Sequence, residues 1–217
     1  MFKNTKEKIL SKAEELFCLK GYEKTTIENI LESCEIGKGT FYYYFKSKES
    51  LMNEVIENFI GSFTDDAKKI VNDKNLSALE KFKQLILGQT NSMDNKEWML
   101  NELHKPENSK MHQKSITETI LHLTPLLTAI VEQGISEKTF NSKFPKETVE
   151  ILLFANQYIF DTGIIVFNVE EYLIKAQAFV YSMELLLGVK SGTFNYILEH
   201  FENTLLNRGE LNEKELQ

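Results

Sequence analysis

The amino-acid sequence predicts an all-α fold, and three observations support this. Apolar residues recur at spacings of three and four through almost the whole chain, which is the period of an amphipathic helix. No segment alternates convincingly between apolar and polar residues as a half-buried strand does. The 217 residues include only 3 prolines and 10 glycines, and several of these separate the helical patterns: Pro106, Gly134, Pro145, Gly188 and Gly192.

The first fifty residues predict three helices and the start of a fourth. The first helix carries an apolar stripe and stops at Gly21. The second begins with a capping box, in which Thr25 is the N-cap and Glu28 lies three residues later. A break at residues 35–37 precedes a short third helix, and Ser47 is the expected N-cap of a long fourth helix. The stripe of that fourth helix is Leu51, Val55, Phe59, Phe63, Ala67 and Ile70.

The rest of the chain predicts six further helices. We expect them near residues 76–91, 95–104, 110–134, 146–167, 170–187 and 193–207. Pro125 falls inside the third of these and should kink it or split it. The helices at 146–167 and 170–187 are apolar on nearly all sides. Each is therefore predicted to be buried, either as a central core helix or in a subunit interface.

Composition limits the classes of protein that fit. With 42% hydrophobic and 26% charged residues, the chain is typical of a folded, soluble protein. The N-terminus lacks the apolar run of a signal peptide, and the longest apolar region, residues 151–167, is short and contains polar residues. We therefore expect no membrane association and a cytoplasmic location. Cys18 and Cys34 fit a reducing compartment as small core residues.

The net charge of −7 is distributed unevenly along the chain. Residues 1–50 contain 9 lysines and 8 acidic residues and carry a charge of +1. Residues 51–217 contain 16 basic and 24 acidic residues and carry −8. This asymmetry permits a small nucleic-acid-binding segment on an acidic body, although it does not require one.

The third helix contains the stretch TFYYYFKSK, with five aromatic residues in a row. Five consecutive helical side chains cannot all face one core, because successive residues are turned by about 100°. Phe41 and Phe45 lie four residues apart and share a face that can anchor the helix. Tyr42, Tyr43 and Tyr44 then cover the outer faces, where tyrosines beside lysines suit contacts with phosphates and thymine methyl groups.

Two short helices joined by a tight turn are either a generic helical hairpin or a helix-turn-helix, whose second helix enters the major groove of DNA. The segment LFCLKGYEKTTIENILESCEIGKGTFYYYFKSKESL resembles the N-terminal DNA-binding domain of TetR-family transcriptional regulators, over about residues 5–55. The resemblance implies a three-helix DNA-binding domain at 1–50, with the helix-turn-helix at about 25–45. It also implies a larger helical effector-binding and dimerisation domain at 51–217, and a homodimer through the two apolar helices near 146–167 and 170–187.

A set of DNA contacts follows from the residue types and the resemblance together. The threonine pair would cap the second helix and touch phosphate, the tip of the third helix would approach base edges, and the later tyrosines and lysines would reach the DNA backbone. The residues are Thr25, Thr26, Lys38, Gly39, Thr40, Tyr42, Tyr43, Tyr44, Lys46 and Lys48. The chain departs from the family pattern in the turn, where Glu35 stands at the position of a left-handed glycine and Gly37 replaces an N-cap serine.

The sequence contains no motif that indicates an enzyme, such as a glycine-rich phosphate loop or a nucleophile elbow. None of the four histidines pairs with another at helical spacing, so we expect no metal site, and we expect no cofactor. The resemblance places a small-molecule pocket among the middle helices, where Asp161 would be an acid within an apolar helix. The candidates for this pocket are Trp98, His104, His122, Tyr158 and Asp161.

These observations predict a ligand-responsive transcriptional regulator. It would be a repressor that binds a near-palindromic DNA operator as a dimer and is released by a small-molecule effector. The alternative is an architectural or partner-controlled DNA-binding protein with the same N-terminal segment and no small-molecule effector.

Overall fold

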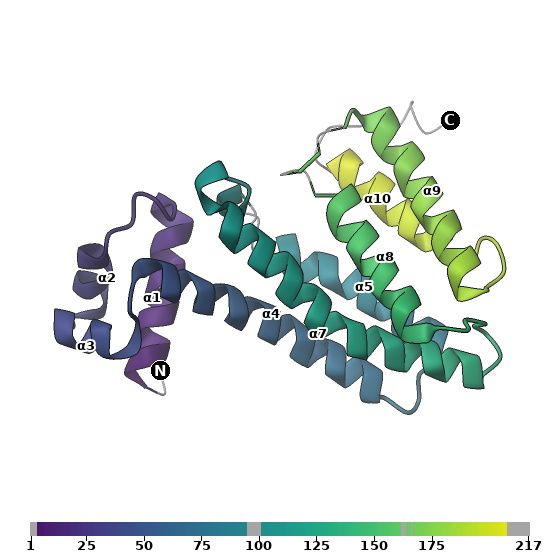
Figure 1. Cartoon of the computed structure of the whole chain (residues 1–217), viewed down its shortest axis with the longest axis horizontal. Coiled ribbons are helices and arrows are strands. Elements are labelled where there is room, and N and C mark those ends of the chain that lie inside the picture. Colours follow the sequence, from purple (N-terminus) through teal and green to yellow (C-terminus); the bar gives the residue numbers. More distant parts are fainter. Residues whose placement is uncertain (1–3, 95–100, 162–163, 166, 208–217) are drawn as a thin grey trace. The chain divides into compact units, whose positions relative to one another are not determined.

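The structure, a computed structural model, describes residues 4–94, 101–161, 164–165 and 167–207 (Figure 1). Every regular element in these ranges is a helix, which confirms the all-α prediction. The elements are α1 (Thr5–Lys20), α2 (Ile27–Cys34), α3 (Lys38–Tyr44), α4 (Lys48–Asn72), α5 (Ala78–Asp94), the 3-10 helix η1 (Pro106–Asn108), α7 (Ser109–Ser136), α8 (Pro145–Ile159), α9 (Val169–Leu187) and α10 (Asn195–Asn207).

The chain packs as two compact units that do not follow chain order. The head unit comprises residues 1–62 and 96–118, and the body unit comprises residues 63–95 and 119–217. Both α4 and α7 therefore contribute residues to each unit. The predicted boundary at residue 50 is a boundary in the sequence, whereas these units are defined by packing and the head unit includes a later segment of the chain. The boundary at residue 50 therefore stays a prediction.

The head unit groups α1, α2 and α3 with the first part of α4 (Figure 1). Its apolar side chains are removed from water in one continuous cluster, which is the main source of its stability. The members from the first part of the chain that are at most 2% exposed are Ile9, Ala13, Phe17, Ile30, Cys34, Phe41, Phe45, Leu51, Met52 and Ile56. Leu103 and Met111 join this cluster from the later segment, so the segment is part of the head's own core.

The N-termini of α2 and α4 test the two predicted caps. Ser47 caps α4, because its hydroxyl accepts the backbone N–H of Ser50 at 3.0 Å, as predicted. The predicted capping box of α2 is wrong by one residue. Thr26 is the N-cap, and its hydroxyl accepts the N–H of Asn29 at 3.1 Å while the Asn29 side chain accepts the N–H of Thr26. Thr25 is not available to cap, because its side chain is buried beneath the turn.

The body unit is built from α8 packed on α9, α9 on α10, and α10 on α5. The rings of Phe82, Phe140 and Phe194 form one cluster in its core, with centroids 5.1 to 6.4 Å apart. Gly134 of α7 lies against the Phe140 ring, where a Cβ would come within 2.4 Å of a ring carbon. A side chain at this position would therefore displace the cluster.

Two predicted helices of the body unit differ from those observed. α7 runs without interruption through Pro125, so the proline does not split it, and the other predicted effect, a kink, stays a prediction. α8 ends at Ile159 and does not continue to residue 167. Phe160 leaves the helix, and its ring stacks on Phe201 of α10 at 5.1 Å and packs edge-on against Tyr172 of α9 at 5.5 Å. This tertiary packing ends a helix that the apolar pattern alone would extend.

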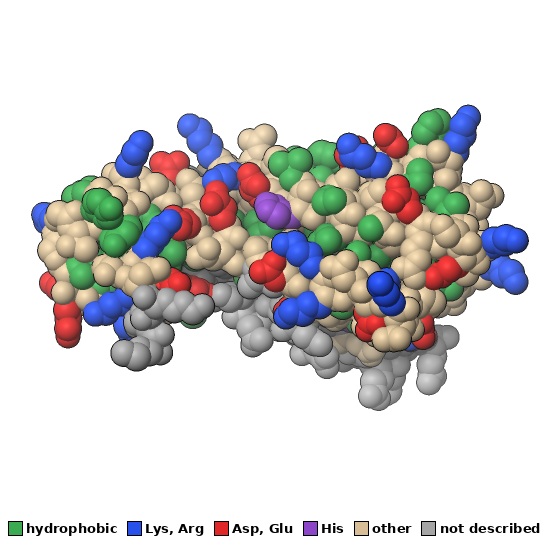
Figure 2. Space-filling view, turned by 90° about the horizontal axis from the view of Figure 1, so that it is seen from below, with side chains coloured by type: hydrophobic (Ala, Val, Ile, Leu, Met, Phe, Trp, Pro, Cys, Tyr) green, Lys and Arg blue, Asp and Glu red, His purple; other side chains and the backbone are tan. Residues whose placement is uncertain are grey.

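The surface gives two further observations. On the face shown in Figure 2, acidic and basic side chains are interspersed, so this face carries no broad area of one sign. Within the described ranges, none of the helices combines the length and the apolar composition needed to cross a bilayer.

Candidate nucleic-acid interface

The aromatic run is divided between core and surface as its spacing predicts. Phe41 and Phe45 are buried and anchor α3 to the head core, with ring centroids 5.8 Å apart. Tyr42 and Tyr43 project outward and are 52% and 81% exposed. Tyr44 is half-buried and meets the Tyr43 ring edge-on at 4.8 Å, which restricts both rings. α3 thus presents aromatic hydroxyls to the outside from a firmly anchored helix.

The first turn of α3 forms the exposed tip of the helix-turn-helix. Lys38, Gly39 and Thr40 are all exposed, and α3 begins after Gly37, which offers no side chain to cap the helix. The first N–H groups of a helix have no partner within the helix, and they favour anions such as phosphate. This tip can therefore approach DNA through backbone N–H groups and short side chains.

An acidic side chain lies beside this tip. The Lys38 ammonium is 3.2 Å from a carboxylate oxygen of Glu28, and both side chains are exposed. A hydrogen bond from its own backbone N–H, and then the hydrogen bond and charge of Lys38, lower the pKa of Glu28. Glu28 is therefore ionised at neutral pH, and an anion that bound Lys38 would have to compete with it.

The turn before α3 has the strained conformation that the sequence suggests. Glu35 ends α2 with φ 54° and ψ 45°, in the left-handed region, and its backbone N–H bonds back to the last turn of α2. A residue with a Cβ is sterically strained in this conformation. Glu35 nevertheless adopts this conformation, so the turn keeps its left-handed geometry although a glutamate side chain replaces the usual glycine.

Lys48 makes contacts inside the head unit. Its ammonium donates to the backbone carbonyl of Tyr22 at 2.9 Å and to that of Glu23 at 3.4 Å. It also lies over the Tyr22 ring, 4.1 Å from the centroid. Lys48 thus ties the first turn of α4 to the α1–α2 turn, whereas Lys46, two residues earlier, is exposed.

The two predicted threonines have different environments. Thr26 is exposed at the start of α2. Thr25 is completely buried, and its hydroxyl donates to the carbonyl oxygens of Gly21 at 2.8 Å and Leu16 at 3.3 Å. In this structure Thr25 cannot reach a phosphate, which corrects that expectation. It instead fixes the turn that orients α2.

Glu102 is a residue of this region that sequence reasoning missed. One carboxylate oxygen accepts the backbone N–H of Tyr22 at 2.9 Å, and the other pairs with Lys105. Asn108 donates to the Glu102 backbone carbonyl at 2.8 Å. Burial is the main cause that raises the pKa of the Tyr22 phenol to about 12, with smaller contributions from Glu23 and Glu49. No sequence signal links Glu102 with Tyr22, which lie 80 residues apart, so only the fold reveals the hydrogen bond between them.

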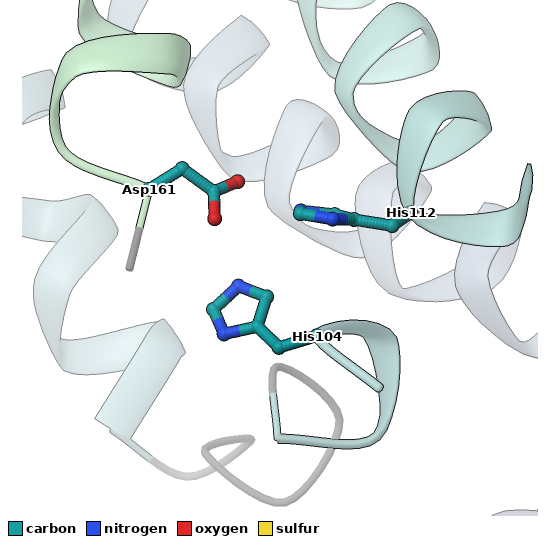
Figure 3. A group of neighbouring side chains, drawn as sticks. All are labelled: His104, His112 and Asp161. Carbon is teal, nitrogen blue, oxygen red and sulfur yellow. The ribbon is translucent and has the colours of Figure 1, made fainter. Parts of the chain in front are cut away.

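The candidate pocket residues do not all fall in one unit. Trp98 lies outside the described residues. His104 is half-buried in the head unit, where its ring lies beside that of His112, with centroids 4.9 Å apart (Figure 3). In the body unit His122 and Tyr158 are exposed. Asp161 is half-buried there and follows the end of α8, so the expectation of an acid within an apolar helix is wrong.

Comparisons with known proteins identify relatives of both parts of the chain. Residues 9–55 match the family of bacterial regulatory proteins of the tetR family, and residues 90–182 match the family of tetracyclin repressor-like C-terminal domains. An uncharacterised HTH-type transcriptional regulator in the lacX 3′ region of Lactococcus lactis is 50% identical over 58 residues, which are 27% of this chain and 30% of that protein. The HTH-type transcriptional regulator QacR of Staphylococcus aureus is 47% identical over 53 residues, 24% of this chain and 28% of QacR.

The matched region spans less than a third of the length of these curated relatives. Solved structures cover more of the chain. The crystal structure of RolR in complex with its ligand resorcinol has a TM-score of 0.62 and is 17% identical, and it covers 89% of this chain and 92% of that one. At this identity the likeness establishes the fold alone.

Proposed function

Because this chain belongs to the TetR family of transcriptional regulators, whose members are DNA-binding regulators and not enzymes, we propose that it is a cytoplasmic, ligand-responsive repressor. As a dimer it would bind a near-palindromic operator through α3 of each copy. A small-molecule effector bound by the body unit would favour a state that releases the DNA, which requires the effector to bind that state more tightly.

The observation that carries this proposal is the exposure of α3 on a buried anchor. Phe41 and Phe45 fix the helix, while Tyr42, Tyr43 and the first turn remain accessible. Aromatic side chains that are exposed next to one another are typical of an interaction surface. A helix of this kind, placed second in a helix-turn-helix, fits the major groove of DNA.

A second copy of the chain is the proposed partner of the body unit. Large apolar side chains project from α8 at positions 151, 154 and 158, and from α9 at 174, 181 and 185, with helical spacing on each. We name this surface the α8–α9 face, and its exposed members are Ile151, Phe154, Tyr158, Ile174, Tyr181, Leu185 and Leu186. Because these side chains are exposed in one copy, they are not part of a single-chain core, and a subunit interface accounts for them.

The proposed effector site lies in the body unit. Among the described residues, the hydroxyls of Thr124, Thr128 and Tyr196 are buried without a hydrogen-bond partner. A buried hydroxyl that makes no hydrogen bond costs free energy, and a bound molecule that supplies the missing bonds recovers it. A structure of the same fold, RolR, holds the small aromatic resorcinol. These features favour a sensor over an architectural protein without an effector.

The DNA-binding part is tested with DNA from upstream of the protein's own gene and of the adjacent gene. Fluorescence anisotropy would measure the affinity at several salt concentrations. We expect Tyr42→Ala to lose affinity for the operator and Lys46→Ala to weaken binding to all sequences, with a smaller salt dependence. If both variants bind as the wild type does, the assignment of α3 is wrong.

The dimer is tested by sedimentation of Phe154→Glu and Tyr181→Glu, each of which places a charge within the α8–α9 face. We expect monomers, or much weaker dimers, because an unpaired charge at a buried contact is strongly unfavourable. Leu121→Glu is the matched control, since Leu121 is a similarly exposed apolar residue on α7, outside this face. A dimer that is insensitive to both α8–α9 substitutions rules out this interface.

A further inference from the structure

His104 and His112 form a side-chain pair that the spacing of the histidines did not predict. One follows the helical residues 101–103, the other lies in the first turns of α7, and η1 separates them. Their ring centroids are 4.9 Å apart, and a nitrogen of each ring lies within 4.8 Å of a nitrogen of the other (Figure 3). Both side chains are half-buried and belong to the head unit.

Two imidazoles at this separation suit a transition-metal cation. Neutral imidazole is the commonest protein ligand of such ions, and it binds zinc with a Zn–N distance of about 2.0–2.1 Å. In a tetrahedral site this places two ligand nitrogens roughly 3.3 Å apart. A small rotation of the two side chains would reach that distance. Their partial burial limits the cost of ordering them and leaves part of each side chain accessible to water.

We propose that His104 and His112 supply two protein ligands to a Zn²⁺-class divalent cation, and that water completes the coordination. Imidazole suits Zn²⁺, Cu²⁺ and Ni²⁺, whereas Mg²⁺ and Ca²⁺ prefer oxygen ligands. The site would therefore select borderline transition metals over the hard cations. This inference is independent of the proposed operator and effector, because it concerns the head unit alone.

Such a metal would stabilise the segment that supports the DNA-binding helices. Glu102, which holds the backbone N–H of Tyr22, lies two residues before His104. Met111, which packs in the head core, directly precedes His112. A metal bridge between the two histidines would cross-link the residues on either side of η1. It would thereby reduce the freedom of the segment that closes the head core.

The experiment uses the full-length chain without an affinity tag, freed of metal with a chelator and kept reduced. Calorimetric titration with Zn²⁺, and separately with Ni²⁺ and Mg²⁺, would measure binding. We expect one saturable Zn²⁺ site per chain, measurable binding of Ni²⁺ and no binding of Mg²⁺. His104→Gln and His112→Gln should each weaken Zn²⁺ binding by at least about tenfold, since each removes a ligand.

His122→Gln is the matched control, since His122 is an exposed histidine of the body unit, and Cys18→Ser controls for binding to the exposed thiol. Both controls should bind Zn²⁺ as the wild type does. The proposal is overturned if the wild type shows no saturable binding, or if neither His104→Gln nor His112→Gln changes the affinity. In either case the two rings would be a packing contact only.

X-ray absorption on the wild type keeps the test decisive if a variant folds poorly. Two imidazole ligands per zinc and a shell of nitrogen and oxygen would support the site, whereas a sulfur shell would overturn it. Zn²⁺ should also raise the unfolding temperature of the wild type in a concentration-dependent way, because it binds the folded state preferentially. Acidification should abolish this increase, since the metal requires deprotonated imidazoles.

Discussion

Glu102 and Tyr22 are separated by 80 residues in the chain, yet a Glu102 carboxylate oxygen accepts the backbone N–H of Tyr22 at 2.9 Å. The carbonyl of Tyr22 accepts from the Lys48 ammonium at 2.9 Å. Charged side chains from two different elements thus satisfy both backbone polar groups of one residue. Because Tyr22 lies in the turn between α1 and α2, this arrangement ties the orientation of the helix-turn-helix to a distant segment.

We expect Glu102→Ala to destabilise the head unit. The substitution leaves the buried N–H of Tyr22 without its acceptor, which costs about 1–3 kcal/mol. Glu102→Gln keeps an acceptor oxygen and should cost less than Glu102→Ala. Urea unfolding would measure both, with Glu132→Ala on the exposed side of α7 as the control. Equal stability of Glu102→Ala and the control would show that this hydrogen bond is dispensable.

The raised pKa of the Tyr22 phenol predicts a loss of stability in alkaline solution. Burial favours the neutral phenol, so its pKa is about 12 in the folded state, against 10.0 for an unperturbed tyrosine. The stabilisation is therefore fully present below pH 10 and is lost as the pH rises through about 12. Tyr22→Phe should show a smaller decrease in unfolding free energy above pH 10 than the wild type. The exposed Tyr43→Phe should follow the wild type, and parallel curves for all three proteins would contradict the prediction.

Local sequence signals predicted those parts of the head that depend on near neighbours. The Ser47 cap and the burial of Phe41 and Phe45 follow from residues that lie a few positions apart, whereas the left-handed conformation of Glu35 was implied only by the family resemblance. The α2 cap was predicted one residue early, because Glu28, three residues after Thr25, completes the usual capping-box pattern, whereas Thr26 has Asn29 at that position. The fold instead buries Thr25, which leaves Thr26 as the cap. Tertiary packing thus decides which of the two adjacent threonines caps α2.

The contacts that link distant segments could not be predicted in this way. The bond between Glu102 and Tyr22 and the pairing of His104 with His112 depend on how the later segment packs in the head core. The end of α8 has a similar cause. An apolar run predicts burial, but the chain leaves the helix at Phe160, where the ring packs against α9 and α10. The sequence of α8 alone carries no information about these partners.

Glu28→Gln should strengthen DNA binding, given the proposed role of α3. Glu28 pairs with Lys38 at the helix tip, and both are exposed, so the pair contributes little to stability. Removing the carboxylate releases Lys38 and eliminates a negative charge near the phosphates. We expect a roughly two- to fivefold gain in affinity at low salt, measured by anisotropy, and a smaller gain at high salt. Glu15→Gln, which breaks the exposed pair with Lys12 on α1, should have no such effect. Unchanged or weaker binding by Glu28→Gln would contradict the prediction.

Two helical glycines should respond in opposite ways to alanine. At Gly88 of α5, no atom among the described residues lies within 4 Å of the position that a Cβ would take, so Gly88→Ala should stabilise the protein by up to about 1 kcal/mol through helix propensity. At Gly134 of α7 the new Cβ would lie 2.4 Å from the Phe140 ring. Gly134→Ala should therefore destabilise it by about 1–3 kcal/mol, as overpacked cores do. Thermal unfolding of both variants tests this, and stabilisation by Gly134→Ala would show that the Phe140 ring relaxes freely.

Glu35 provides a test of the strain in the turn before α3. At φ 54° a Cβ is unfavourable, so Glu35→Gly should be more stable than Glu35→Ala by about 1 kcal/mol. Both variants remove the carboxylate, and their difference therefore isolates the backbone conformation. Lys138, with φ 61°, should show the same order of glycine over alanine. Glu32, an exposed residue in the ordinary helical backbone of α2, should show the reverse order by a similar amount. Urea unfolding measures all three pairs, and if alanine is favoured over glycine at position 35, the left-handed turn is not maintained in solution.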